Sequence, residues 1–434
     1  MAGLIWDKAG AAVDDRIQRF LAGDDVILDR ALFLYDVRAS KAHVRGLARI
    51  GVLEETEAAS LVAELDALAE AFLAGAFTLD DRFEDGHSAI EAHLVERLGD
   101  TGRKVHTGRS RNDQVLVASR LYLRDALAEV ERRSLLVASA LLDRAEATAG
   151  VPMPGYTHLQ RAVPSSVGLW LAGFAEAMID NAALARSTAA WIDCCPLGTA
   201  AGYGVNLPLD RQGVAAELGF ARLQVNPVYA QNSRGKFEIQ ALTALLQPLL
   251  DVRRFAWDLS LYTTAEFGFV TLPASYTTGS SIMPNKKNPD VVELLRASPA
   301  VVEGALAEIA AILSLPSGYH RDLQATKAPL LRAMSSGLHA LSLVDELVRR
   351  LSFDEARMAA AVSPDMFATD RAVELTREGV PFRTAYQRVA EELPTLAGRT
   401  AEESLTKRVS PGAPGQLLLD ELRARLQNAV QHRD

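Results

Sequence analysis

The stretch from Gln114 to Ala149, QVLVASRLYLRDALAEVERRSLLVASALLDRAEATA, contains neither glycine nor proline. Its apolar residues recur at the spacing of one helix side: Leu116, Leu123, Leu127, Val130, Leu141 and Leu142. The side predicted to face solvent carries Arg120, Arg124, Glu131 and Arg132. Gly150 and the prolines that follow it are typical of a helix end. The stretch therefore predicts one long, uninterrupted helix.

Four further segments have the same helical period and few breakers: residues 166–193, 233–266, 289–315 and 328–351. Pro248 and Pro299 lie inside two of them, so we expect kinks at these positions. Five long helices predict a helical bundle, and the abundance of alanine and leucine with few aromatic residues favours an all-α fold.

Shorter helices are predicted on both sides of this long-helix region. Residues 25–50, 54–74 and 84–98 precede it, and the segment after residue 353 is repeatedly interrupted by proline. We therefore predict three domains: an N-terminal helical domain (1–105), a central long-helix bundle (106–353) and a small C-terminal helical domain (354–434). The best candidate for a short strand is Leu223–Tyr229.

The composition narrows the classes of function. The chain has 434 residues, 49% of them hydrophobic, and a formal net charge of −9. A nucleic-acid-binding surface would need clustered excess lysine and arginine, so that class is disfavoured. A few well-placed cations could still bind an anionic substrate.

The compartment is predicted from cysteine usage and from the chain start. The only two cysteines, Cys194 and Cys195, are adjacent, which favours buried free thiols over a structural disulfide or a metal site. The first residues lack a basic start followed by an apolar run, so no signal peptide is predicted. We found no run of about 18 apolar residues, and we expect a cytoplasmic protein without membrane spans.

A polar segment directly before the longest helix, Val105–Gln114 (VHTGRSRNDQ), is the first candidate for chemistry. The free N–H groups at a helix N-terminus suit an anion, and Arg111 could clamp a carboxylate. In the alternative interpretation, Asn112 or Asp113 caps the helix while the arginines are solvated.

Two later segments also concentrate reactive groups. In Gly155–Pro164 (GYTHLQRAVP), His158 lies among Thr157, Gln160 and Arg161, although a lone histidine in a loop is more often structural. The segment Gly279–Asp290 (GSSIMPNKKNPD) combines hydroxyls, lysines and two prolines. It is either a solvated loop or, because it contains Ile282 and Met283, a loop that folds onto a site.

The segment Gly279–Asp290 resembles the Gly-Ser-Ser-x-Met-Pro-x-Lys-x-Asn signature of the fumarase/aspartase superfamily. Its members release fumarate by removing a proton next to a carboxylate. The segments 106–114 and 155–164 resemble the argininosuccinate lyase branch in particular. Further similarity occurs at 207–211, 319–327 and 379–383, whereas residues 6–10, 198–206 and 233–236 depart from the commonest pattern.

The resemblance implies a role for each matching residue in the cleavage of argininosuccinate to arginine and fumarate. Ser280 is implied as the base, with Lys286 lowering its pKa and Asn288 donating a hydrogen bond. His158 is implied on the general-acid side, with Glu293 orienting its ring. Substrate contacts are implied for a larger set: Arg111, Asn112, Thr157, Arg234, Tyr319, Gln324, Lys327 and His87, the last of which could instead have a capping role.

The resemblance also implies a homotetramer, because the family builds each site from loops of three subunits. No cofactor or metal is implied: the sequence has no His-Glu-x-x-His zinc motif and no Gly-x-x-x-x-Gly-Lys phosphate loop. The alternatives are another lyase of the superfamily, such as adenylosuccinate lyase, fumarase or aspartase, and a non-catalytic structural protein on this fold. A serine hydrolase is disfavoured because no Gly-x-Ser-x-Gly elbow occurs.

Overall fold

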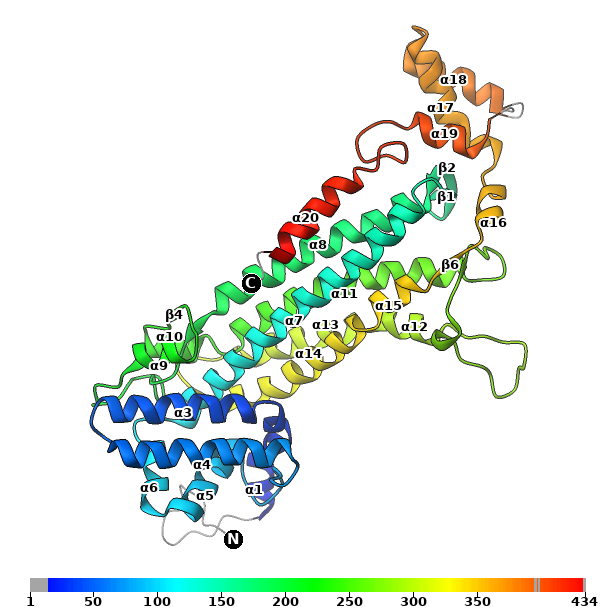
Figure 1. Ribbon diagram of the computed structural model, residues 1–434. Helices are drawn as coiled ribbons and strands as arrows, with labels where there is room; N and C mark the ends of the chain where they lie inside the picture. The colour runs from blue at the N-terminus through cyan, green and yellow to red at the C-terminus, as the bar shows by residue number, and fades with distance from the viewer. Residues whose placement is uncertain (1–14, 394–395, 397–398, 432–434) are drawn as a thin grey trace. The chain divides into compact units, whose positions relative to one another are not determined.

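The computed structural model describes residues 15–393, 396 and 399–431, and confirms the predicted all-α class (Figure 1). The divergent residues Trp6–Gly10 lie outside the described part of the chain. The chain divides into two compact units, each built from three segments. The first unit comprises Met1–Ala128, Ala185–Ala244 and Val302–Ser335, and the second comprises Glu129–Leu184, Leu245–Val301 and Ser336–Asp434. The three-domain division at 1–105, 106–353 and 354–434 stays a prediction.

The five segment boundaries fall inside five helices: α7 (Arg111–Ala147), α8 (Val167–Ile192), α11 (Lys236–Tyr262), α13 (Pro299–Ile312) and α14 (Lys327–Leu341). Two of the long helices predicted from the sequence are each divided in two. The first division, between α12 (Asp290–Ala297) and α13, follows from Pro299, which has no N–H to donate and occupies the first position of the new helix. The second division lies between α14 and α15 (Val344–Arg349), and no proline or glycine occurs at this position in the sequence.

The remaining elements of the first unit are mostly short helices, apart from α3 and α4, which lie side by side (Figure 1). Leucines at positions 47, 61, 65 and 94 form its core with Phe33. These remaining elements are α1 (Asp15–Ala22), α2 (Asp25–Leu28), η1 (Asp29–Ala31), α3 (Phe33–Arg49), α4 (Glu55–Leu73), α5 (Gly86–Leu98), α6 (Asp100–Arg103), η2 (Lys104–His106), β3 (Cys194–Cys195), α9 (Arg211–Glu217), β4 (Arg222–Leu223), α10 (Pro227–Asn232) and η4 (Arg321–Thr326).

In the second unit, α8 packs on α11 through Trp170. Its indole stacks on Phe255 with ring centroids 5.4 Å apart and donates a 2.8 Å hydrogen bond to Asp258. The other elements of this unit are β1 (Pro152–Thr157), β2 (Gln160–Ser166), β5 (Val270–Thr271), η3 (Ala274–Tyr276), β6 (Ser352–Phe353), α16 (Glu355–Ala360), η5 (Pro364–Phe367), α17 (Ala368–Arg377), α18 (Phe382–Glu392), α19 (Ala401–Lys407) and α20 (Leu419–Gln431).

Two predictions about individual residues were wrong. Arg120 and Glu131 were expected on the solvent side of α7, yet both are buried. The guanidinium of Arg120 lies 4.0 Å from the ring centroid of Phe237 and donates to Cys194 Sγ at 3.0 Å, so a cation–π contact and polar acceptors replace water. Cys194 and Cys195 are buried free thiols, as predicted.

The predicted strand Leu223–Tyr229 was also largely wrong, because only its first residue belongs to a strand. The rest enters α10, which begins at Pro227. Asn226 caps this helix by accepting a 3.0 Å hydrogen bond from the Tyr229 N–H. An asparagine followed by proline is a helix start signal, and here it overrides the apolar strand-like pattern.

One helix in the described part of the chain, α8, meets the length and composition criteria for crossing a membrane, although the sequence was expected to contain none. An 18-residue window of α8 has a mean hydropathy of 1.2, and half of that window is buried inside the protein. Glu176 and Asp180 on this helix each pair with Arg425 of α20 at 2.6 Å. Burial and ion pairing within the fold are typical of a core helix.

Two glycines of α8 test how tightly this helix is packed. A Cβ at Gly168 would lie 2.6 Å from Ala149 Cα and 2.9 Å from the Ala145 carbonyl, whereas a Cβ at Gly173 meets nothing within 4 Å. We expect Gly168→Ala to destabilise the protein by about 1–3 kcal/mol through overpacking against backbone. Gly173→Ala should stabilise it by up to about 1 kcal/mol because alanine has the higher helix propensity. Urea unfolding of both variants would check this; equal stabilities would contradict the packing described.

Candidate active site

A cavity of about 420 Å³ lies in the first unit. Its wall is mainly charged: Asp25, Glu84, Asp85, Arg109, Arg111, Arg234, Arg321 and Lys327. The structure brings together in this wall seven of the residues predicted as substrate contacts: His87, Arg111, Asn112, Arg234, Tyr319, Gln324 and Lys327. These residues come from α5, the start of α7 and two later segments of the chain, so the cavity depends on long-range contacts.

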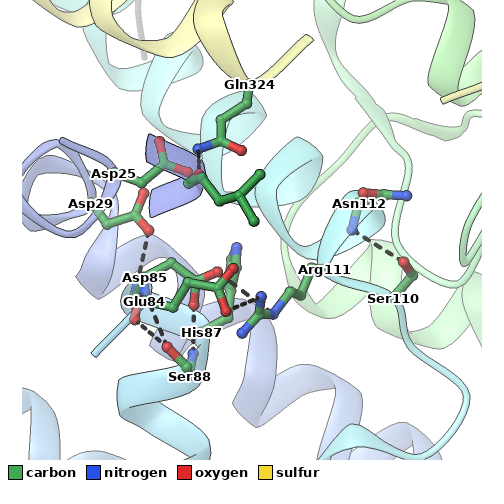
Figure 2. Close-up of polar contacts among 12 residues, drawn as sticks. Asp25, Asp29, Glu84, Asp85, His87, Ser88, Ser110, Arg111, Asn112 and Gln324 are labelled. Atoms are coloured by element: carbon green, nitrogen blue, oxygen red, sulfur yellow. Dashed lines mark hydrogen bonds and ion pairs between the residues drawn. The ribbon is translucent and has the colours of Figure 1, made fainter. Parts of the chain in front are cut away.

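Arg111 is the first residue of α7, and two carboxylates hold its guanidinium (Figure 2). Its Nη1 lies 2.9 Å from Glu84 Oε2, and its Nε lies 3.6 Å from Asp85 Oδ2. The alternative in which this arginine is solvated is therefore wrong. At the helix start the Ser110 hydroxyl accepts a 3.3 Å hydrogen bond from the Asn112 N–H, and Asp113 Oδ1 accepts the Ser110 N–H at 2.9 Å. The alternative in which Asp113 contributes to the helix cap therefore holds.

Asp113 joins the start of α7 to a distant loop. Its carboxylate is fully buried and accepts hydrogen bonds from the N–H groups of Ser110 at 2.9 Å, Gly198 at 3.0 Å and Ala200 at 2.8 Å. A carboxylate with several backbone donors is a rigid junction, because breaking one bond leaves a buried polar group unsatisfied. Arg111 and Asn112 are therefore presented from a fixed helix end.

Asp29 and Lys327 form a second buried junction. Lys327 Nζ lies 2.7 Å from Asp29 Oδ1 and 3.2 Å from Asp25 Oδ1, while Asp29 Oδ2 accepts a 2.8 Å hydrogen bond from the Gly86 N–H. Burial alone would lower the pKa of Lys327, but the two carboxylates outweigh it and raise that pKa. The lysine is therefore charged, with one ammonium serving two acids.

Three further predicted residues lie in the same wall. Arg234 is buried, and no ion pair to it is formed within the described residues, so its charge remains available. Burial lowers the pKa of its guanidinium, and the Tyr319 side chain opposes this shift. Gln324 donates from Nε2 to the Leu21 carbonyl at 3.1 Å, which leaves its amide oxygen open to another partner (Figure 2).

The pKa values of two histidines in the wall are shifted in opposite directions. Burial would lower the pKa of His87, but Asp36, Asp85 and Asp29 raise it to about 9. Burial, together with the charges of Arg109 and His87, lowers the pKa of His106 to about 4. At neutral pH, His87 is a cation and His106 is neutral.

The second unit carries the other predicted residues. Strands β1 and β2 pair as an antiparallel hairpin in which Thr157 faces Gln160, and the segment was expected to be only a loop. The two residues of its turn, His158 and Leu159, have φ angles of 55° and 58°. Such left-handed conformations are costly for residues other than glycine, and strained turns concentrate at functional sites. His158 and Thr157 are exposed at the hairpin tip.

The segment from Thr278 to Asn288 forms a closed loop. The backbones of these two residues pair with each other, and Asn288 Nδ2 donates to the Gly279 carbonyl at 3.3 Å. Inside the loop, Ser280 Oγ accepts hydrogen bonds from the N–H groups of Ile282 at 3.4 Å and Met283 at 3.1 Å. Lys286 is exposed, as is Ile282 at 82%.

Glu293 follows this loop on α12. In the structure its carboxylate pairs with Arg296 at 3.4 Å, and that guanidinium lies 4.3 Å from the ring centroid of Trp257. His158 is not its partner among the described residues. No group of three or more histidine, cysteine, aspartate or glutamate side chains in the described part of the chain has a geometry suited to a metal ion.

Comparisons with known proteins identify the family. A family model described as a lyase matches residues 14–304. A curated argininosuccinate lyase from Stenotrophomonas maltophilia is 60% identical, and the match covers 98% of this chain and 99% of that protein. The chain belongs to the argininosuccinate lyase family.

Solved structures agree with this membership. A crystal structure of EDDS lyase in complex with formate has a TM-score of 0.78 at 25% identity, covering 98% of this chain and 91% of that one. A class II fumarase from Schistosoma mansoni has a TM-score of 0.75 at 17% identity, covering 96% of this chain and 95% of that one, which establishes the shared fold alone. The predicted fumarase/aspartase-like fold is thereby confirmed.

Prediction from family motifs missed the acidic half of the cavity. Asp25, Glu84 and Asp85 line it, and Asp29 and Asp36 lie behind it. The run Glu84-Asp85-Gly86-His87 was visible in the sequence and is the signal that could have led to two of them. Asp25, Asp29 and Asp36 lie on α2, η1 and α3, and no local pattern marked them.

Removing the cation that serves two buried acids tests this site. We expect Lys327→Met to destabilise the protein by about 3–5 kcal/mol, because Asp29 would remain buried without its partner. The matched control is Lys41→Met, which breaks the more exposed ion pair with Asp66 and should cost less than about 1 kcal/mol. Urea denaturation measures both, and a similar small loss in the two variants would contradict a structural role for the Lys327 pair.

Proposed function

We propose that this chain catalyses the β-elimination of argininosuccinate to L-arginine and fumarate, the last step of arginine biosynthesis, in the cytoplasm. The observation that carries the proposal is the 60% identity to a curated argininosuccinate lyase over nearly the whole of both chains. The cavity supports it independently, because it offers both cations for carboxylates and carboxylates for an ammonium or guanidinium group. Argininosuccinate carries groups of both signs.

In this proposal the succinyl carboxylates are bound at the start of α7. Arg111 offers a guanidinium suited to bidentate contact, and Asn112 adds an amide within the first turn of the helix, where free N–H groups favour an anion. Thr157 contributes a hydroxyl from the hairpin. Four further residues, Arg234, Tyr319, Gln324 and Lys327, hold the remainder of the substrate, with His87 as an additional donor.

Ser280 acts as the base that removes a proton from the succinyl carbon that lies next to a carboxylate and next to the carbon bonded to the departing nitrogen. The carbanion that forms is delocalised into the adjacent carboxylate, and the C–N bond then breaks to give fumarate. A serine hydroxyl needs its negative form stabilised to act in this way. The N–H groups of Ile282 and Met283, which donate to Ser280 Oγ, provide part of this stabilisation. Lys286 adds a positive charge, and Asn288 donates a hydrogen bond.

His158 supplies the proton taken up by the departing guanidinium nitrogen, so the two proton transfers balance. The turn conformation that places His158 at the tip of the hairpin is consistent with this role. Glu293 would orient the imidazole in the assembled enzyme. Within one chain Glu293 pairs with Arg296, and in the proposed tetramer the imidazole that it orients comes from another copy of the chain.

A homotetramer with sites shared between subunits completes the proposal. The cavity wall belongs entirely to the first unit, whereas the Ser280 loop and the His158 hairpin belong to the second. Ile282, Met283 and Leu294 leave large apolar surfaces exposed on and next to the Ser280 loop, as expected for groups that a neighbouring subunit covers.

Product analysis tests the reaction. Purified protein incubated with argininosuccinate should release fumarate and arginine in equal amounts, because one C–N cleavage yields one of each. Ser280→Ala should reduce kcat by about three orders of magnitude or more, as loss of an activated nucleophile or base typically does. Ser281→Ala, which alters the neighbouring exposed hydroxyl, is the control and should retain most activity. Absence of both products with argininosuccinate, but turnover of another succinyl compound, would reject the proposed substrate.

Mixed tetramers test the sharing of sites. Ser280→Ala and His158→Ala are each expected to be inactive, because each lacks one of the two proton-transfer groups. Mixing them under partial denaturation and renaturing should restore some activity, since a fraction of hybrid sites then draws an intact Ser280 and an intact His158 from different chains. Hybrids whose formation is verified by native mass spectrometry, but which remain inactive, would count against shared sites.

A further inference from the structure

Behind the start of α7, four charged side chains lie in a row of alternating sign. His87 Nδ1 donates a 2.5 Å hydrogen bond to Asp36 Oδ2 on α3. Asp85 is the N-cap of α5, the helix that carries His87 in its first turn, and Asp85 Oδ2 lies 3.6 Å from Arg111 Nε. The order is therefore carboxylate, imidazolium, carboxylate and guanidinium. Arg111 is the member proposed to bind a substrate carboxylate, and His87 is proposed as an additional donor to the remainder of the substrate, whereas Asp36 and Asp85 have no proposed contact with it.

The burial of this row is difficult to explain by stability alone. The side chain of His87 is 9% exposed and that of Asp36 is 3% exposed. Among the described residues, neither His87 Nε2 nor Asp36 Oδ1 finds a hydrogen-bond partner. Removing charges from water is costly, and incompletely satisfied buried pairs are weak contributors to stability. A pair retained in this form fits a positional role better than a purely structural one.

The fixed points of the row make it suited to positioning. Asp85 caps α5 by accepting a 2.7 Å hydrogen bond from the Ser88 N–H, and the Gly86 N–H is held by Asp29 at 2.8 Å. These contacts prevent Asp85 from following Arg111 if the arginine turns away. The charge on His87 then determines how much negative charge Asp85 presents to the guanidinium.

We propose that Asp36 is a positioning residue that acts through the His87 imidazolium and Asp85 to hold Arg111 in the orientation that binds a substrate carboxylate. This inference deepens the proposed lyase function and rests on it. Without a cation at position 87, Asp85 and Glu84 would attract Arg111 more strongly and compete with the incoming carboxylate. With the cation, part of the charge of Asp85 is neutralised and the guanidinium can be shared with the substrate.

The groups around His87 account for its charge. Asp36 of α3, Asp85 at the cap of α5 and Asp29 of η1 favour the imidazolium. His106 of η2 also lines the cavity, and burial together with the charges of Arg109, His87 and Arg111 keeps it neutral. Burial opposes protonation of His87, but the three carboxylates outweigh this effect, so the pKa of His87 is about 9. The charged form is present through neutral pH and is lost as the pH rises through this value.

Asp36→Asn tests the proposal because it keeps the shape of the side chain and removes its charge. We expect its KM for argininosuccinate at pH 8 to rise about tenfold, with kcat changed less than about twofold. In the unaltered enzyme KM should stay constant up to about pH 8 and rise near pH 9. In Asp36→Asn this rise should begin at lower pH. Asp66→Asn, at an exposed ion pair with Lys41, is the matched control and should change neither value.

Two further measurements separate positioning from structural damage and from a failure of the proposed function. The dissociation constant of fumarate, measured by calorimetry, reports carboxylate binding without turnover and should also weaken in Asp36→Asn. The chain has 8 histidines, so the His87 imidazole signal in a ¹³C-histidine spectrum can be assigned with His87→Gln. It should be protonated at pH 8 in the unaltered protein and neutral in Asp36→Asn.

Three outcomes would overturn the inference. One is that KM, the pH at which KM begins to rise and the affinity for fumarate are all unchanged in Asp36→Asn. Another is a neutral His87 at pH 8 in the unaltered protein. The third is an equal loss of kcat, substrate affinity and thermal stability at every pH, which is the result of structural damage. Fumarate binding that weakens as expected in a protein that does not cleave argininosuccinate would reject the substrate but retain the positioning role.

Discussion

The cavity depends on one buried carboxylate, Asp29, which holds three distant segments together. It accepts the Gly86 N–H at 2.8 Å and pairs with Lys327 Nζ at 2.7 Å, 298 residues along the chain. The pair need not contribute much net stability, because the desolvation of both ions offsets their attraction. Its main effect is geometric: α5 and the start of α14 cannot separate without leaving a buried charge unpaired. Tyr319 and Gln324 on one side and His87 on the other therefore keep their places around the same cavity.

In the proposed function, a protein with a formal net charge of −9 binds an anion through a local arrangement of charge. Arg234 has no ion-pair partner within the described residues, whereas Arg111 and Lys327 are each shared by two acids. Cations already paired with carboxylates remain charged in a buried environment, and their partners limit how strongly they hold a product. An array of unpaired cations would have lower pKa values and would release fumarate poorly. The acidic residues behind the site are thus part of the proposed anion-binding function.

How far the fold was predictable can be seen element by element. Helical periodicity predicted α7, α8 and α11 because they are long, apolar on one side and free of internal proline apart from the tolerated Pro248. The two glycines inside α8, Gly168 and Gly173, did not mask its helical pattern. Pro299 marked a real break, but the break before Val344 has no proline or glycine at it and so no local signal. The hairpin of β1 and β2 was missed because prolines at 152, 154 and 164 argue against strands and its turn contains His158-Leu159 in place of Asn-Gly. Arg120 was misplaced because a cation–π partner, Phe237, lies over 100 residues away in the sequence.

The same distinction separates the predicted from the missed parts of the site. Residues inside ordered motifs, such as Arg111 and the Tyr319–Lys327 segment, were found by resemblance, and the structure places them in one cavity. Asp36 and Asp29 gain their significance only from partners 51 and 57 residues away, His87 and Gly86. A carboxylate on an amphipathic helix is normally a solvated group, so nothing local distinguishes these acids from the many exposed ones. Their burial beside a cation is what makes them informative: an acid that remains charged without water must be balanced by a group whose position it thereby fixes. In this protein that group is His87 for Asp36 and Lys327 for Asp29, and both lie in the wall of the cavity.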